Sequence, residues 1–107
     1  MQPATREFDR TLANTHMNIG LVQRAKGQVN LAETQFGMAQ EIRSRLLTSE
    51  PHDQRVLRDR AKGFYSLGTL YFYVAKPSEE ALVRSENDLL RAIKDFGDLL
   101  NSRPDDL

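Results

Sequence analysis

Imidazole and thiol side chains, which often carry acid–base or metal chemistry, are few in this chain of 107 residues. It contains no cysteine and two histidines, His16 and His52. Two imidazoles in separate segments, without thiolates, do not form the four-ligand set that zinc requires. The acidic pair at Asp105 and Asp106 could attract a hard cation, but we interpret it as a capping or unstructured terminal pair. The sequence therefore predicts no metal site.

Patterns for nucleophilic or phosphate-transfer chemistry are also missing from the sequence. The glycines never form a phosphate-binding loop followed by Lys-Ser or Lys-Thr. Serines and threonines are scattered, and none has a base at the spacing of a catalytic triad. We expect His16 to be a packed core side chain with one hydrogen bond, and His52 to be a solvated turn residue. The sequence thus predicts a protein that is not an enzyme, with no catalytic residue and no cofactor.

Composition restricts the class of protein further. Fifteen Lys and Arg residues balance fifteen Asp and Glu residues, so the formal net charge is zero. A general nucleic-acid binder needs a basic excess to displace counterions, so we expect that this chain has no nucleic-acid partner. No apolar run approaches the roughly 20 residues of a membrane span, and no signal peptide is recognisable. We therefore expect one soluble, cytoplasmic domain over residues 1–107 with no membrane association.

Helical periodicity accounts for most of the chain. Apolar residues recur at steps of three or four in four segments, which places each set on one face of a helix. The stripes are Phe8, Leu12, His16, Ile19 and Gln23; Ala32, Phe36, Ala39, Ile42 and Leu46; Leu57, Ala61, Phe64, Leu67, Tyr71 and Val74; and Leu82, Ser85, Leu89, Ala92, Phe96 and Leu99. Gly27 is typical of the position just past a helix, and Asp53 and Ser78 are typical N-caps. No segment alternates with period two, so we predict an all-α fold of four helices of about 18 to 22 residues.

The chain also matches itself. Residues 10–20 align with residues 58–68, and residues 32–51 align with residues 85–104. The two halves are therefore predicted to be helix-turn-helix units, covering about 5–50 and about 53–103, which is the signature of a solenoid. Pro51 and Pro104 occupy equivalent places, and a third unit would begin where the chain stops.

The second helix of each unit carries a small, large, small pattern, and the first helix carries a glycine near its centre. These residues are Ala32, Phe36 and Ala39 with Gly20, and Ser85, Leu89 and Ala92 with Gly68. The pattern resembles the tetratricopeptide repeat, which implies two antiparallel helix pairs stacked as a short right-handed α-solenoid. His16 and Gln23 depart from the aromatics usual in that family.

Glycines inside predicted helices, Gly63 and Gly97, suggest close packing or bending. A closed four-helix bundle is the alternative fold.

The units are longer than those of most tetratricopeptide repeats, at about 48 to 53 residues instead of 34. Units of this length are similar to long-repeat arrays attached to bacterial serine/threonine kinases. No kinase motif is present, so the resemblance implies that this chain is a fragment of a longer array and that any kinase activity would belong to another part of the protein.

The resemblance places one face of each first helix on a concave surface. The residues of that face are Asn14, Met17, Leu21, Arg24, Arg58, Lys62, Tyr65, Thr69 and Phe72. Exposed aromatics and methionine beside arginines are typical of peptide anchor sites. We therefore predict a non-catalytic protein–protein interaction scaffold that binds a protein or peptide segment with apolar anchors and acidic flanks.

A structural role is the alternative. Two repeats leave apolar ends without a neighbour, and arrays need caps to stay in solution. Met17, Leu21, Tyr65, Phe72 and Tyr73 would then pack on further repeats or on a second copy. Under this hypothesis the chain is a spacer, or a dimerisation or regulatory segment of a larger bacterial protein such as a serine/threonine kinase, with homo-oligomer formation through the exposed ends.

Overall fold

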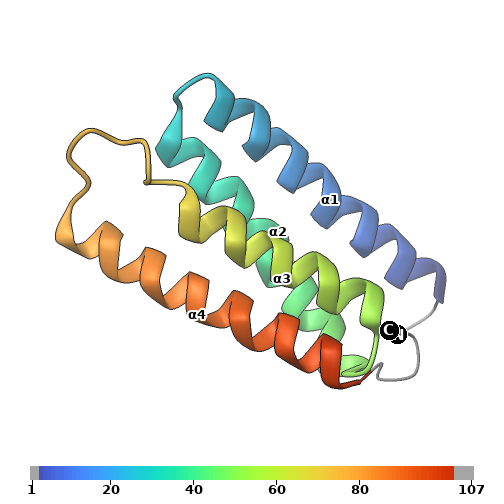
Figure 1. Ribbon diagram of the computed structural model, residues 1–107. Helices are drawn as coiled ribbons and strands as arrows, with labels where there is room; N and C mark the ends of the chain where they lie inside the picture. Colours follow the sequence, from blue (N-terminus) through green and yellow to red (C-terminus); the bar gives the residue numbers. More distant parts are fainter. Residues whose placement is uncertain (1–2, 103–107) are drawn as a thin grey trace.

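The computed structural model describes residues 3–102, which form four antiparallel helices (Figure 1). They are α1 (Pro3–Ala25), α2 (Val29–Ser49), α3 (Gln54–Thr69) and α4 (Glu79–Asn101). Within this range no residue is in a β-strand, so the all-α prediction is confirmed. The predicted roles of Pro104, Asp105 and Asp106 lie outside the described residues.

The helix boundaries follow local signals in the sequence. Gly27 separates α1 from α2 with a φ of 77°, a left-handed conformation that glycine adopts without strain. The Asp53 carboxylate accepts a hydrogen bond from the Val56 backbone N–H at 3.2 Å, which caps α3. The Ser78 hydroxyl oxygen accepts one from the Ala81 N–H at 3.0 Å and caps α4. All three predicted breaks are confirmed.

The third helix is shorter than its apolar stripe suggested. It ends at Thr69, so Tyr71 and Val74 lie in the segment that connects α3 to α4. Aromatic and β-branched side chains lose rotamer freedom in a helix, which weakens helix formation at this point. Leu70 is buried against Ala32 and Phe36 instead. The predicted extension of this helix to residue 74 is therefore wrong.

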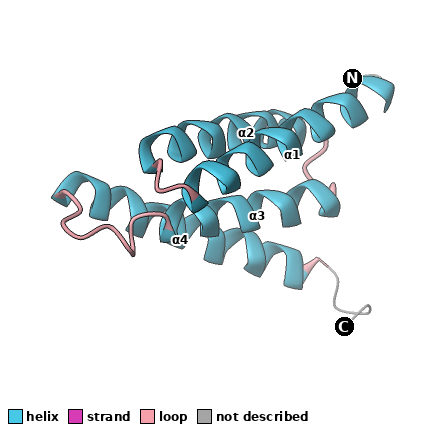
Figure 2. Ribbon diagram, turned by 90° about the horizontal axis from the view of Figure 1, so that it is seen from above, coloured by secondary structure: helices cyan, strands magenta, loops and turns pink. Residues whose placement is uncertain are grey.

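The helices form a row in chain order. The main contacts join α1 to α2, α2 to α3 and α3 to α4. In Figure 1, α1 and α4 lie at opposite edges of this row, and Figure 2 shows α3 between the first hairpin and α4. As a result α2 and α3 have main neighbours on two sides, whereas α1 and α4 each pack mainly against one helix.

The core is centred on α2. One cluster of buried side chains joins the middle and end of α2 to α1 and to the start of α3, and a second lies around Phe36. The first contains Ala13, Ala39, Ile42, Leu46, Leu47, Val56 and Leu57, and the second contains Ala32, Phe36 and Leu70. Met17 packs against both clusters, so α1 contributes to the core along its middle.

Glycines allow the two helices of each hairpin to approach closely. A Cβ atom added to Gly20 would lie 2.6 Å from the Phe36 ring, and one added to Gly68 would lie 2.5 Å from Leu89. Gly63 lies against the side chains of α2, as expected for close packing. Gly97 has nothing within 4 Å of an added Cβ, so the packing interpretation is wrong there.

The buried face of α1 is not the one that the apolar stripe predicted. Phe8, Leu12 and Ile19 are exposed, whereas Ala13 and Gly20 are buried. Small residues permit close contact with α2, and no element within residues 3–102 covers the opposite face. The stripe of α4 is wrong in the same way at Leu82 and Phe96, which are exposed.

The prediction for His52 is confirmed, whereas that for His16 is confirmed only for its single contact, because His16 lies outside both core clusters. His16 is half-buried, and its Nδ1 lies 2.7 Å from the Gln35 side-chain oxygen. His52 is exposed in the turn between α2 and α3.

Candidate partner-binding groove

A groove runs between the C-terminal halves of α1 and α3. Its larger hollow, of about 540 Å³, is lined by Leu21, Arg24, Ala25, Gly27, Val29, Tyr65, Thr69, Leu70, Phe72, Tyr73 and Val74. A smaller hollow of about 230 Å³ is lined by Met17, Leu21, Arg43, Asp59, Lys62, Gly63 and Ser66. Leu21 belongs to both, so the two hollows form one groove along α1.

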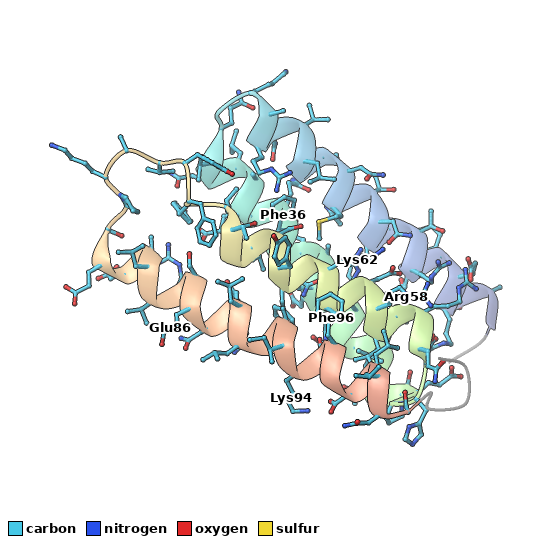
Figure 3. The ribbon with its side chains drawn as sticks, viewed as in Figure 1. Phe36, Arg58, Lys62, Glu86, Lys94 and Phe96 are labelled. Atoms are coloured by element: carbon cyan, nitrogen blue, oxygen red, sulfur yellow. The ribbon has the colours of Figure 1, made fainter. Side chains whose placement is uncertain are left out.

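Most of the predicted groove residues meet in this groove. Met17, Leu21, Arg24, Lys62, Tyr65, Thr69 and Phe72 line one hollow or the other. Asn14 and Arg58 line neither hollow. The Asn14 side-chain oxygen accepts a hydrogen bond from Arg43. Arg58 is exposed nearer the start of α3, as its label in Figure 3 shows.

The apolar residues of the groove divide into a floor and free anchors. Met17 and Leu21 are half-buried and pack against the core clusters. Tyr65 is 57% exposed and Phe72 is 59% exposed. The floor is therefore part of the folded core, whereas the two aromatic rings remain open to a ligand.

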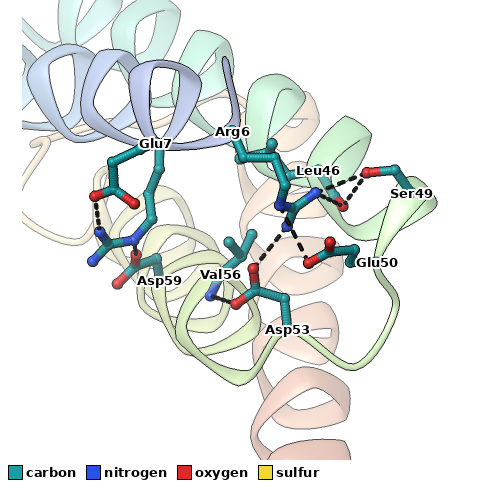
Figure 4. A network of polar contacts seen from close by, with 9 residues as sticks. Arg6, Glu7, Leu46, Ser49, Glu50, Asp53, Val56 and Asp59 are labelled. Atoms are coloured by element: carbon teal, nitrogen blue, oxygen red, sulfur yellow. Dashed lines mark hydrogen bonds and ion pairs between the residues drawn. The ribbon is translucent and has the colours of Figure 1, made fainter. Parts of the chain in front are cut away.

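The opposite end of the space between α1 and α3 is closed by ion pairs (Figure 4). Arg6 lies 2.7 Å from Asp53 and 3.3 Å from Glu50. Arg10 lies 3.6 Å from Asp59. Arg6 also donates to the Leu46 carbonyl oxygen at 3.2 Å, which ties the start of α1 to the α2–α3 turn. This leaves only the half of the groove near Tyr65 and Phe72 accessible.

The protonation of Asp53 reflects this network. Burial by itself raises the pKa of this carboxyl. Hydrogen bonds from Arg6 and from the Val56 N–H favour the ionised form more strongly, so the pKa of Asp53 is held below its ordinary value. The ionised carboxylate therefore contributes to folding at neutral pH.

A buried arginine forms part of the groove floor. Arg43 is 5% exposed, and its guanidinium donates to the side-chain oxygens of Asn14 and Gln40, both at 3.0 Å. Its Nε has no partner among the described residues. Burial lowers the pKa of Arg43, and the charge of Asp59 partly offsets this effect. Arg43 adds positive charge beneath the groove, which Asp59 balances in part.

Sequence reasoning missed the polar part of the floor. Gln40 is also buried, and its amide nitrogen donates to the Arg60 carbonyl oxygen at 2.8 Å. The available signal was the position of Gln40 and Arg43 beside Ala39 and Ile42, inside the apolar stripe. A polar residue next to such a stripe is usually solvated, and only a second packed helix turns it into a buried one.

Another hollow, separate from the groove, has a volume of about 520 Å³ and lies between the α2–α3 turn and the end of α4. Its lining consists of Ser44, Thr48, His52, Gln54, Arg60, Asp98, Asn101 and Ser102 together with Leu47, Pro51 and Leu57. It contains no aromatic carbocycle to anchor an apolar side chain. We therefore place the candidate site at the α1–α3 groove.

The described residues offer little support for other kinds of site. No group of three or more His, Asp or Glu side chains between residues 3 and 102 could hold a metal ion. Within the same range, every helix is too short or too polar to span a bilayer.

No family model, no curated protein and no solved structure matches the chain.

Proposed function

We propose that this chain is a non-catalytic interaction module that binds a segment of a partner protein along the α1–α3 groove. The observation that carries the proposal is the pair of exposed rings, Tyr65 and Phe72, beside Leu21 and Arg24 in one hollow. Tyr and Arg are enriched among the interface residues that contribute most of the binding free energy. Open aromatic rings on a packed floor are therefore suited to anchor a ligand side chain.

The side chains around the groove specify the chemistry of the ligand. An apolar anchor would fill the larger hollow between Tyr65 and Phe72. Arg24 and Lys62 are exposed at the edges of the groove and would attract acidic residues that flank the anchor. Exposed charge pairs are screened by salt, so binding should weaken moderately as ionic strength rises.

The proposal includes a tetratricopeptide-like arrangement of the two hairpins. The matched contacts of Gly20 with Phe36 and of Gly68 with Leu89 support it, because both hairpins then use the same packing rule. The row of contacts from α1 to α4 also supports it. In such an array α1 and α3 are the first helices of their units and line the concave surface.

The test is a selection of ligands from a displayed library of random peptides. We expect enriched peptides to combine an apolar residue with flanking Asp or Glu. Tyr65→Ala and Phe72→Ala should each weaken their binding about tenfold or more, as for truncated anchor residues. Val83→Ala is the matched control, since Val83 is equally exposed but lies on α4, and it should leave affinity unchanged.

Two results would contradict the groove proposal. One is a set of enriched peptides that bind the Tyr65→Ala/Phe72→Ala double variant as tightly as the original chain. The other is a selection that yields no peptide above background while the chain retains its helical circular dichroism.

A second function, a spacer or dimerisation segment of a larger protein, is favoured by a different observation. Exposed apolar side chains also lie on the outer faces of α1 and α4, away from the groove. Faces of this kind mark contacts with another protein surface. Substitutions on these faces, and not in the groove, should disturb this function.

A further inference from the structure

Exposed apolar side chains gather on the two outer edges of the row of helices. The α1 end face consists of Phe8, Leu12, Ile19 and Val22. The α4 end face consists of Leu82, Val83, Leu90, Ile93, Phe96 and Leu100. Figure 1 shows that α1 and α4 form opposite edges, so these are two separate surfaces.

The α4 end face is the counterpart of the surface of α2 that α3 covers. The alignment of residues 32–51 with residues 85–104 pairs Gln40, Arg43 and Leu47 with Ile93, Phe96 and Leu100. The three residues of α2 are at most 8% exposed, whereas the three of α4 are between 42% and 68% exposed. The α4 end face thus has the position of a helix-packing surface, and no helix between residues 3 and 102 covers it.

The α1 end face is the counterpart of the surface of α3 that packs on α2. Alignment of residues 10–20 with residues 58–68, continued outward, pairs Phe8 with Val56 and Val22 with Leu70. Val56 is 1% exposed against 67% for Phe8, and Leu70 is 3% exposed against 57% for Val22. Each end face therefore matches one half of the internal α2–α3 interface.

The exposed side chains of both end faces are apolar, so the two surfaces are compatible. In the internal interface the Gln40 amide donates to the Arg60 carbonyl oxygen and lies against Gly63. The counterpart of Gln40 is Ile93, and the counterpart of Arg60 is Leu12. Because that acceptor is a backbone carbonyl, Ile93 would forgo this hydrogen bond, and contact between the end faces would gain from burial of their exposed apolar side chains.

Charge distinguishes this pairing from contact between two copies of α4. Acidic residues outnumber basic ones on α4. The α1 end face does not carry the arginines of α1, because Arg6 and Arg10 pair with carboxylates near the start of α3 and Arg24 lines the groove. Bringing two α4 helices together would oppose like charges, and bringing α4 to α1 would not.

We propose that a second copy of this chain docks head to tail, with the α4 end face of one copy packed against the α1 end face of the next. The contact would repeat the step that joins α2 to α3 within the chain. Such a heterologous contact leaves one end face open on each terminal copy, so it produces rings or open chains of copies. This inference rests on the second proposed function and is independent of the groove.

The test measures molar mass by sedimentation equilibrium over a wide range of protein concentration. We expect the mass of the original chain to rise with concentration beyond that of a dimer. Ile93→Glu and Leu12→Glu each add a charge to one end face and should weaken association at least a hundredfold. Mixing these two variants should restore a one-to-one heterodimer and nothing larger, because each variant keeps one intact end face.

Tyr73→Glu is the control, because Tyr73 is 97% exposed in the α3–α4 connection, outside both end faces, and its association should match that of the original chain. Circular dichroism should show that all variants keep their helices. A chain that stays monomeric at every concentration would overturn both the inference and the dimerisation function. Dissociation by Ile93→Glu but not by Leu12→Glu would overturn the head-to-tail contact alone, since it would indicate dimers formed through α4.

Discussion

Equivalent surfaces of α2 and α4 differ in both polarity and exposure. The surface of α2 that meets α3 includes Gln40 and Arg43 and is buried, whereas the same positions of α4 hold Ile93 and Phe96 and are exposed. Buried polar groups are tolerated in α2 because Asn14 and the Arg60 carbonyl oxygen provide hydrogen-bond partners. The difference teaches that the covering helix, more than the polarity of the side chain, decides what is buried in this fold.

The largest expected effect comes from truncating the large side chain that contacts a glycine of the partner helix in each hairpin, which is Phe36 in α2 and Leu89 in α4. Phe36 is completely buried, so Phe36→Ala should lower the free energy of unfolding by about 3–5 kcal/mol. Leu89 is only half-buried, and Leu89→Ala should cost about 1–2 kcal/mol. Urea unfolding followed by circular dichroism measures both. Equal losses would show that the two hairpins are packed equally well and would remove the contrast.

Truncating the paired positions Arg43 and Phe96 tests the contrast itself. Arg43→Ala would remove the donor to the side-chain oxygens of half-buried Asn14 and buried Gln40, which should cost about 2–3 kcal/mol. Phe96→Ala should lower the free energy of unfolding by about 1 kcal/mol at dilutions where the chain is monomeric, because the Phe96 ring is partly covered. A larger loss for Phe96→Ala than for Arg43→Ala would contradict the assignment of covered and open surfaces.

Adding a methyl group to two glycines compares a close helix contact with open space. Gly68→Ala would force the new Cβ against Leu89, and after the gain in helix propensity the net loss should be about 1–2 kcal/mol. Gly97→Ala meets no neighbour and should raise the free energy of unfolding by up to about 1 kcal/mol. The two variants should thus shift the urea midpoint in opposite directions. A shift in the same direction would show that α3 and α4 adjust freely around Gly68.

The smallest effect concerns the helix caps, which differ in charge. Ser78→Ala should cost about 1 kcal/mol at pH 7, because it removes one N-cap hydrogen bond, and Asp53→Ala should cost more, because it also removes the contact with Arg6. The pKa of Asp53 is lowered by folding, so its ionised form stabilises the protein above the unfolded value of about 3.9. This contribution is lost as pH falls through the folded value.

The loss caused by Asp53→Ala should therefore shrink as the pH is lowered below about 4, while that of Ser78→Ala stays constant. Thermal unfolding at several pH values compares the two variants directly. A constant difference for Asp53→Ala would show that its ionisation does not contribute to folding.

Local features of the fold were predictable from the sequence to the extent that they depend on few neighbouring residues. The break at Gly27 depends on backbone conformation, and the two N-caps depend on one side chain each. The close contacts at Gly20 and Gly68 each depend on one glycine and one large side chain. The end of α3 at Thr69 was missed, because Leu70 and Tyr71 leave the helix to contact α2. Contact with another helix overrode the apolar periodicity there.

The candidate groove was predictable in part for the same reason. The shared helix face of Tyr65 and Thr69 could be read from their spacing. Phe72 lies beyond the end of α3, so it is not on that helix face, although it lines the same hollow. Asn14 was misplaced and Arg43 was missed, because the hydrogen bond between them joins α1 to α2. No pattern within either helix contains that information.

By itself the sequence determined that the chain forms four helices and where most of them begin and end, since capping and left-handed turns are local interactions. Only the tertiary structure decided which side of α1 and α4 is buried. Each of these helices carries apolar residues on two sides, and only the position of the neighbouring helix distinguishes one side from the other. The free energy of burying apolar surface depends on the area covered, and that area is a property of the packed row of helices.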